Sequence, residues 1–114
     1  MRLTIVSVGH KMPEWVATAT HDYVKRMPAD CSIDIKEIKP DLTPAKEANK
    51  ILAAIPKGSR VIALDERGKD QTTQNLANQL ARWRQEGDDI TFLIGGADGL
   101  DSSLKTGAQE MWRL

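Results

Sequence analysis

The chain has 114 residues, of which 40% are hydrophobic and 28% are charged, and 16 Lys and Arg residues balance 16 Asp and Glu residues. A chain of this length buries enough apolar surface to fold as one domain without cross-links, so we expect a single domain over residues 1–114. The formal net charge of zero excludes binding to nucleic acid through the overall field of the protein, and any such contact requires a local patch.

The single cysteine and the absence of long apolar runs indicate the cellular compartment. Cys31 alone forms neither an intramolecular disulfide nor a multi-thiolate metal site, which is typical of the cytoplasm, and we expect it to be buried. The apolar residues 3–8 are too few for a signal peptide, and no apolar run reaches the roughly 20 residues that cross a bilayer. The sequence therefore predicts a cytoplasmic protein with no membrane partner.

Strand-like and helix-like segments alternate in the first half of the chain. Residues 3–8 are apolar on both faces, which predicts a buried strand. Apolar side chains at four-residue spacing after Pro13 predict a helix that Pro28 ends. Residues 32–38 alternate apolar and polar side chains, as on a strand at the edge of a sheet. Thr43 as N-cap then predicts a helix that begins at Pro44 and stops at Pro56 and Gly58.

The same alternation continues in the second half. Residues 61–64 form an apolar run typical of a strand buried on both faces, and residues 90–94 form another. Between them, Thr72 or Thr73 caps a helix that ends at Gly87. Asp101 is expected to cap a last helix with Leu104, Ala108, Met111 and Trp112 on one side.

This order of elements predicts the α/β class: a mostly parallel sheet with helices on both faces. The three tryptophans, Trp15, Trp83 and Trp112, each lie on an apolar helical stripe. We therefore assign them to the core rather than to base stacking.

Two polar or glycine-rich segments follow predicted strands and belong at the same end of the sheet. Residues 65–69 are predicted to form a loop after one strand, and residues 95–99 form a turn after another. Ligands bind at the carboxyl ends of parallel strands, and glycines let a ligand approach the main chain, which suits an adenosine-containing cofactor. The alternative is that the glycines serve only a tight strand-to-helix turn. Neither the G-x-G-x-x-G pattern nor a phosphate loop occurs in the chain.

Titratable residues near these segments give few candidates for chemistry. Asp65 and Glu66, with Asp98, are the only acidic group suited to Mg²⁺, but a solvated pair is the simpler interpretation, and we predict no metal site. His10 is a candidate general base if its loop reaches the same end of the sheet, whereas His21 is typical of a partly exposed helix residue.

Basic side chains concentrate in the first part of the chain. They could contact phosphates if the fold gathers them, although solvated surface lysines are the commoner outcome. The candidates are Lys11, Lys25, Arg26, Lys36, Lys39, Arg67 and Lys69.

Three segments resemble a known family. Residues 8–15 (VGHKMPEW), 63–69 (ALDERGK) and 92–100 (FLIGGADGL) are similar in sequence and order to the RlmH family of ribosomal RNA large-subunit methyltransferases, which belongs to the SPOUT superfamily. The I-G-G-x-x-G-L core of the third segment is specific within that superfamily.

The resemblance implies the α/β-knot fold and a defined reaction. It implies methylation at N3 of a pseudouridine in 23S rRNA, with S-adenosylmethionine as methyl donor, by a homodimer on the assembled ribosome. Carried over by position, Leu64 and Gly96 contact the cofactor, with Gly95 beside them. The catalytic base stays open, with His10, Glu66 and Arg67 as candidates.

The resemblance also implies differences from the family. Its members continue past the last predicted helix with a further strand, a knotted loop that completes the cofactor pocket and a final helix, so we expect this chain to lack the knot segment. The connection over residues 40–47 is shorter than in the family. The alternative function is a non-catalytic α/β binding domain with a partial cofactor cleft. A receiver-like signalling domain is disfavoured, because it would need acidic residues directly after the first strand, where this chain has Gly9, His10 and Lys11.

Overall fold

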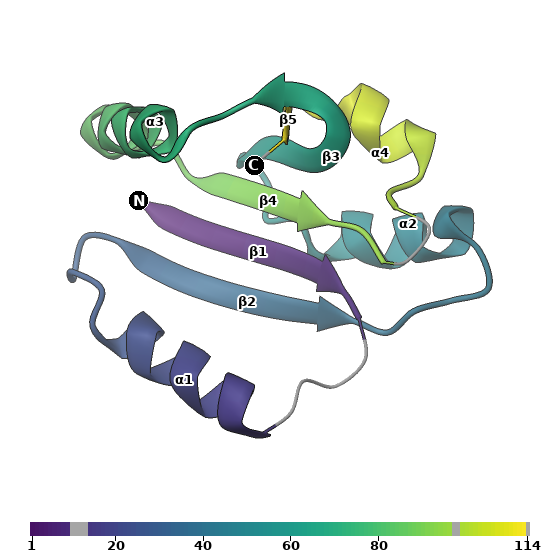
Figure 1. Ribbon diagram of the computed structural model, residues 1–114, viewed down its shortest axis with the longest axis horizontal. Coiled ribbons are helices and arrows are strands. Elements are labelled where there is room, and N and C mark those ends of the chain that lie inside the picture. Colours follow the sequence, from purple (N-terminus) through teal and green to yellow (C-terminus); the bar gives the residue numbers. More distant parts are fainter. Residues whose placement is uncertain (10–13, 97–98, 114) are drawn as a thin grey trace.

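The computed structural model describes residues 1–9, 14–96 and 99–113, with the backbone alone at positions 14–17, 20 and 23. In chain order the elements are β1 (Arg2–Val8), α1 (Glu14–Lys25), β2 (Ser32–Ile38), α2 (Pro44–Ala54), β3 (Arg60–Asp70), α3 (Thr73–Glu86), β4 (Ile90–Ile94), α4 (Ser102–Gly107) and β5 (Glu110–Arg113). They form one five-stranded sheet in the order β2-β1-β4-β3-β5, and every neighbouring pair is parallel (Figure 1). The predicted α/β class is confirmed. Within the described ranges, no helix is long and apolar enough to cross a membrane.

Two hydrophobic clusters lie on opposite faces of the sheet. One joins the strands to α2 and α4 and contains Val6, Val8, Ala48, Ile51, Ala63, Leu93, Leu100 and Leu104. The other joins the strands to α3 and contains Leu3, Cys31, Ile62, Trp83, Ile90 and Trp112. Because neighbouring residues of a strand point to opposite faces, Ile62 and Ala63 serve different clusters. The expected burial of the Cys31 thiol is confirmed.

Short-range signals place the helix ends. The Thr43 hydroxyl accepts a hydrogen bond from the Lys46 amide at 3.2 Å, and the Thr72 hydroxyl accepts one from the Asn75 amide at 3.0 Å. Gly87 ends α3 in the left-handed conformation, with φ of 75°. Asp101 caps α4 by accepting the Ser103 amide at 3.1 Å. These predicted caps are confirmed, with Thr72 rather than Thr73 at the start of α3.

Strand β3 continues through residues 65–69, so the predicted loop there is wrong. β3 bends around β5, as Figure 1 shows, and both Leu64 and Lys69 pair with Trp112 across a shift in register. Gly68 allows this bend, because a Cβ atom there would lie 2.6 Å from the backbone N and C atoms of Trp112. The polar side chains of this segment therefore stand on a curved strand rather than on a loop.

The last predicted helix is also wrong beyond Gly107. Helix α4 ends there, and residues 110–113 form β5 against the outer edge of β3. Val61 and Gln109 exchange hydrogen bonds, from the Val61 amide to Gln109 Oε1 at 2.7 Å and from the Gln109 amide to the Val61 carbonyl at 3.0 Å. The edge of β3 thus offers backbone partners that a continued helix would leave unpaired.

The tryptophans at positions 83 and 112 lie in the core, as predicted. Their rings stack at 5.5 Å between centroids with 9° between planes, and Phe92 packs against both. The Trp15 side chain lies outside the described residues. Trp112 reaches the core from a strand and not from the helical stripe that we expected.

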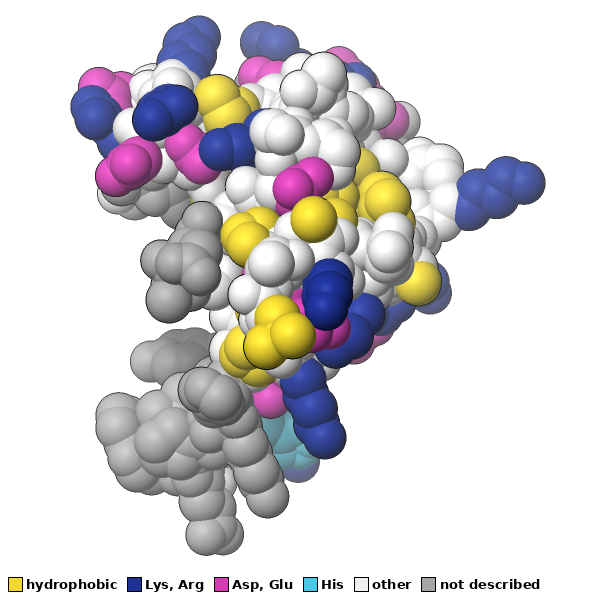
Figure 2. Space-filling model, turned by 90° about the vertical axis from the view of Figure 1, so that its right-hand side faces the viewer, with side chains coloured by type: hydrophobic (Ala, Val, Ile, Leu, Met, Phe, Trp, Pro, Cys, Tyr) yellow, Lys and Arg dark blue, Asp and Glu magenta, His cyan; other side chains and the backbone are white. Residues whose placement is uncertain are grey.

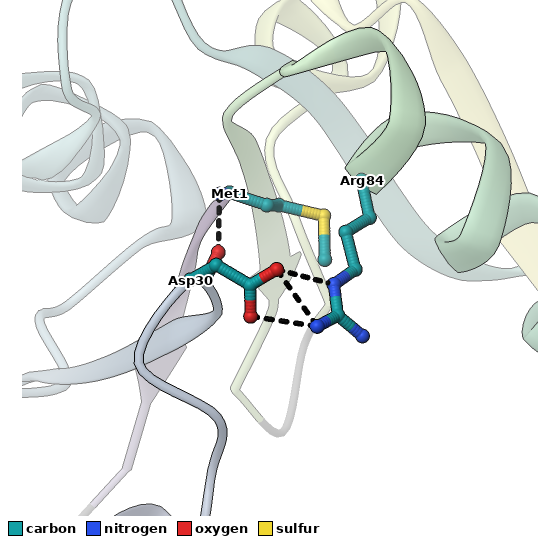
Figure 3. A network of polar contacts seen from close by, with 3 residues as sticks. All are labelled: Met1, Asp30 and Arg84. Carbon is teal, nitrogen blue, oxygen red and sulfur yellow. Dashed lines mark hydrogen bonds and ion pairs between the residues drawn. The ribbon is translucent and has the colours of Figure 1, made fainter.

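A polar network ties the start of the chain to α3 at the amino end of the sheet (Figure 3). Arg84 of α3 donates from Nε and Nη2 to the Asp30 carboxylate at 2.6–2.9 Å, and the Met1 ammonium donates to the Asp30 carbonyl at 2.7 Å. The Asp30 pKa is held below its usual range, first by the hydrogen bond from Arg84. Because these groups are exposed to water, the contacts fix the position of the first residue beside α3 but add little to the free energy of unfolding.

Candidate functional site

The middle of β3 lies beside the end of β4 at the carboxyl edge of the sheet. Leu64 of β3 pairs with Ile94 of β4, so Asp65 and Gly95, which follow them directly, lie next to each other on neighbouring segments. The expectation that the segment after Leu64 and the glycine turn lie together is confirmed.

The glycine turn after β4 is formed by close contacts of the main chain with itself. The Gly99 amide donates to the Gly96 carbonyl at 3.0 Å, and Gly99 has φ of 76°. A Cβ atom on Gly95 would lie 2.5 Å from the Gly99 carbonyl carbon and 2.7 Å from the Leu100 nitrogen. A Cβ atom on Gly96 would meet Val8 Cγ1 at 3.2 Å, a contact that a small shift relieves. The turn's own packing therefore requires glycine at position 95, and main chain is left bare on its surface.

A hollow of about 520 Å³ opens between the turn, residues 64–67 of β3 and helix α4. This volume lies within the range of about 300–1,000 Å³ that small-molecule sites occupy. Two apolar side chains, three glycines and four charged side chains line it: Leu64, Ile94, Gly95, Gly96, Gly99, Asp65, Glu66, Arg67 and Lys105. Figure 2 looks onto this carboxyl end of the sheet, where apolar side chains alternate with charged ones. The hollow thus combines apolar walls, bare main chain and both signs of charge.

Asp65 and Lys105 bring opposite charges together inside the hollow. Lys105 Nζ lies 3.4 Å from Asp65 Oδ2, with the side chains 28% and 11% exposed. The other Asp65 oxygen accepts the Arg67 amide at 2.8 Å. The hydrogen bond from the Arg67 amide, and then Lys105, hold the pKa of Asp65 below its usual range. Asp65 is therefore an ionised, oriented carboxylate on the wall of the hollow.

The lowered pKa of Asp65 predicts acid sensitivity. A carboxylate with a lower pKa in the folded state stabilises the fold above its unfolded pKa, and this contribution disappears as the pH falls through the folded pKa. We therefore expect the free energy of unfolding to fall less between pH 7 and about pH 3 in Asp65→Asn than in the unmodified protein. Urea denaturation at both pH values measures this, and equal losses in the two proteins would contradict it.

The structure gives the positions of several titratable residues that the sequence singled out. Glu66 and Arg67 line the hollow with exposed side chains. His21 on α1 is exposed, in line with the expectation of a helix residue at the surface. His10 and Asp98 lie outside the described residues. Over the ranges that are described, no three His, Cys, Asp or Glu side chains gather as a metal-binding group.

The basic side chains have mixed roles. Lys36 donates to the Ala54 carbonyl at 2.9 Å and so joins β2 to the end of α2. Of the seven candidates, Arg67 lines the hollow. Lys11 lies outside the described residues. The structure thus gives Lys36 a structural contact and leaves Arg67 at the site.

Sequence reasoning missed Lys105. It lies four residues after the Asp101 cap, in a helix predicted only for its apolar side. Its place near Asp65 follows from the position of α4 beside the middle of β3, and no spacing in the sequence reports that distance. The sequence alone favoured a solvated pair at 65–66, and it is the fold that buries the Asp65 side chain to 11% exposure and so calls for a cation beside it.

Comparisons with known proteins identify the family. All residues, 1–114, match the family described as "Predicted SPOUT methyltransferase". A protein of Polynucleobacter asymbioticus named Ribosomal RNA large subunit methyltransferase H is 90% identical over 114 residues, which are 100% of this chain and 78% of that protein. Proteins with the same name are 79% identical in Polynucleobacter necessarius subsp. necessarius and 50% identical in Paraburkholderia phymatum, with 100% of this chain covered and 76% and 79% of theirs. The chain therefore belongs to the SPOUT methyltransferase family.

Proposed function

We propose that this protein is an S-adenosylmethionine-dependent methyltransferase that modifies N3 of a pseudouridine in 23S rRNA on the assembled ribosome. The observation that carries the proposal is the pairing of Leu64 with Ile94, which brings the segment 63–69 and the glycine turn around one hollow. The names of the relatives support ribosomal RNA of the large subunit as the substrate.

The lining of the hollow fits the proposed cofactor. Bare main chain at Gly95 and Gly96 offers polar groups for the adenine, with the Gly96 carbonyl already accepting one hydrogen bond from the Gly99 amide, and Leu64 offers an apolar surface beside them. We assign these three residues to cofactor binding. When bound, S-adenosylmethionine supplies a methyl group on a positively charged sulfur, which a nucleophilic nitrogen can attack.

The residues of this chain would contribute positioning and proton removal. Holding the two reactants in line lowers the barrier, because the entropy of their encounter is already lost on binding. The pseudouridine N3 must also lose its proton, and Glu66 stands exposed on the rim of the hollow as one candidate base. Arg67 is a candidate for contacts with the RNA phosphates or the developing charge, and His10 remains a candidate outside the described residues.

We further propose that the active form is a homodimer in the cytoplasm. Leu42 and Leu52 are exposed, at 82% and 56%, and are available to an interface. The domain carries no net charge, so recognition of the ribosome would depend on local groups such as Arg67 rather than on the overall field.

Transfer of a labelled methyl group tests the function. The protein, with its intact mass verified, is incubated with labelled S-adenosylmethionine and ribosomes that lack the modification, with fully modified ribosomes as control. Incorporation into the unmodified 23S rRNA alone is the expected result. Binding of S-adenosylhomocysteine without any incorporation would favour the alternative, a non-catalytic binding domain, and absence of both binding and incorporation would overturn the proposal.

A further inference from the structure

We propose that Asp65 and Lys105 form a subsite for a zwitterionic amino-acid group, and that in this protein the subsite holds the methionine end of the methyl donor. The ligand carboxylate would lie on the Lys105 ammonium and the ligand ammonium on the Asp65 carboxylate. The inference rests on the proposed function, because it names the part of the ligand that this side of the hollow takes.

The two side chains come from different walls of the hollow. Asp65 stands on the curved part of β3, and Lys105 stands on α4, which follows the glycine turn. Both line the same hollow as Leu64, Gly95 and Gly96. A ligand in contact with the turn and with Leu64 therefore meets this pair at the same time.

The pair retains hydrogen-bonding capacity for a ligand. The separation of 3.4 Å between Lys105 Nζ and Asp65 Oδ2 is longer than the roughly 2.7–2.9 Å of a strong charge-assisted hydrogen bond. An ammonium group has three N–H donors, and each carboxylate oxygen has about two acceptor sites. The Arg67 amide donates to Asp65 Oδ1 and Lys105 lies beside Oδ2, so each oxygen keeps acceptor capacity for a ligand ammonium.

Partial burial makes the pair selective for a ligand with both charges. With the Asp65 side chain 11% exposed and that of Lys105 28% exposed, water screens their charges only in part. A ligand with one charge would compensate one side chain and separate it from the other, which leaves the second charge uncompensated. A ligand that carries an ammonium and a carboxylate on one carbon compensates both.

Two ligands that share the nucleoside separate this subsite from the rest of the hollow. S-adenosylhomocysteine carries the amino-acid group, and 5′-deoxy-5′-methylthioadenosine lacks it. In calorimetry we expect Lys105→Met to weaken binding of S-adenosylhomocysteine about ten-fold or more and to change binding of methylthioadenosine less than about two-fold. Asp65→Asn should show the same selective loss, and Asp65→Asn with Lys105→Met should lose little more than either single variant.

Lys50→Met is the matched control. Lys50 also forms an ion pair with an aspartate, at 3.2 Å from Asp41 Oδ2, but it does not line the hollow. Its loss should leave the affinities for both ligands unchanged. Lys105→Arg retains the charge and should restore most of the affinity for S-adenosylhomocysteine, and thermal unfolding with near-UV circular dichroism reports whether each variant is folded.

The outcomes separate this inference from the proposed function. If the unmodified protein binds both ligands and Lys105→Met weakens both equally, or neither, the subsite is overturned while the proposed cofactor site stands. If Lys105→Met is unfolded, the affinities for both ligands are compared in Lys105→Arg and Asp65→Asn instead. An equal change in both affinities in Asp65→Asn then overturns the subsite. If the unmodified protein binds neither ligand, the proposed function fails and the subsite fails with it.

Discussion

Replacing Gly95 with alanine is expected to abolish measurable binding of S-adenosylhomocysteine. The new Cβ atom would lie 2.5 Å from the Gly99 carbonyl carbon and 2.7 Å from the Leu100 nitrogen. Because both contacts are with backbone, no rotation of a side chain relieves them, and the turn that forms one wall of the hollow has to move. Calorimetry of the purified variant measures the loss, and we expect at least a hundred-fold weakening, equivalent to about 2.7 kcal/mol or more.

Alanine variants at two further glycines serve as controls for this result. A Cβ atom on Gly107, at the end of α4, meets nothing within 4 Å, so Gly107→Ala should leave binding unchanged. Gly96→Ala should be intermediate, since its closest contact is the Val8 side chain at 3.2 Å. Unchanged affinity in Gly95→Ala would show that the main chain of this turn does not form the ligand site.

The largest loss of stability is expected from Trp112→Ala. The Trp112 side chain is 1% exposed and stacks on Trp83. Removal of a buried tryptophan side chain lowers the free energy of unfolding by about 3–5 kcal/mol, because apolar burial is lost and a cavity remains. Since Trp112 also holds β5 against the curved part of β3, the variant should lose ligand affinity as well. Urea denaturation followed by circular dichroism measures the change in stability.

Trp112→Phe controls for the aromatic contact. It retains a ring against Trp83 and Phe92 and should cost clearly less than the alanine variant. A loss below about 1 kcal/mol in Trp112→Ala would be inconsistent with a core tryptophan and would show that β5 is not docked on β3 in solution.

Boundaries that depend on neighbouring residues were predictable from the sequence. The caps at Thr43, Thr72, Gly87 and Asp101 depend on bonds to residues at most four positions away or on one backbone conformation. The strands over residues 3–8, 32–38 and 90–94 were predictable for a related reason, because their hydrophobic pattern reports directly how many faces are buried.

The segment 108–113 was predicted wrongly because its pattern is ambiguous. Ala108, Met111 and Trp112 have a helix-like spacing, but residues 110–113 pair with β3. A strand of four residues is too short for its periodicity to distinguish it from a helix. The free edge of β3, which is formed by residues about fifty positions earlier, selects the strand.

Some residues of the candidate site were also predictable from the sequence, and others were not. The glycine turn was recognised from local chemistry and Leu64 from the resemblance, and the structure brings them to one hollow. Lys105 was missed because its distance from Asp65 depends on how α4 packs beside β3. The bend of β3 was missed because it needs Gly68 to lie against the backbone of Trp112.

The amino-acid sequence alone was sufficient to predict the helix caps, the burial of the strands and the residue types at the carboxyl edge. These are local properties, because each depends on bonds or periodicity within a few residues. The strand order, the bend of β3, the strand at residues 110–113 and the pairing of Asp65 with Lys105 belong only to the folded chain. Each requires contact between segments far apart along the chain, and such contacts are selected by the backbone edges and apolar surfaces that remain to be covered once the local elements have formed.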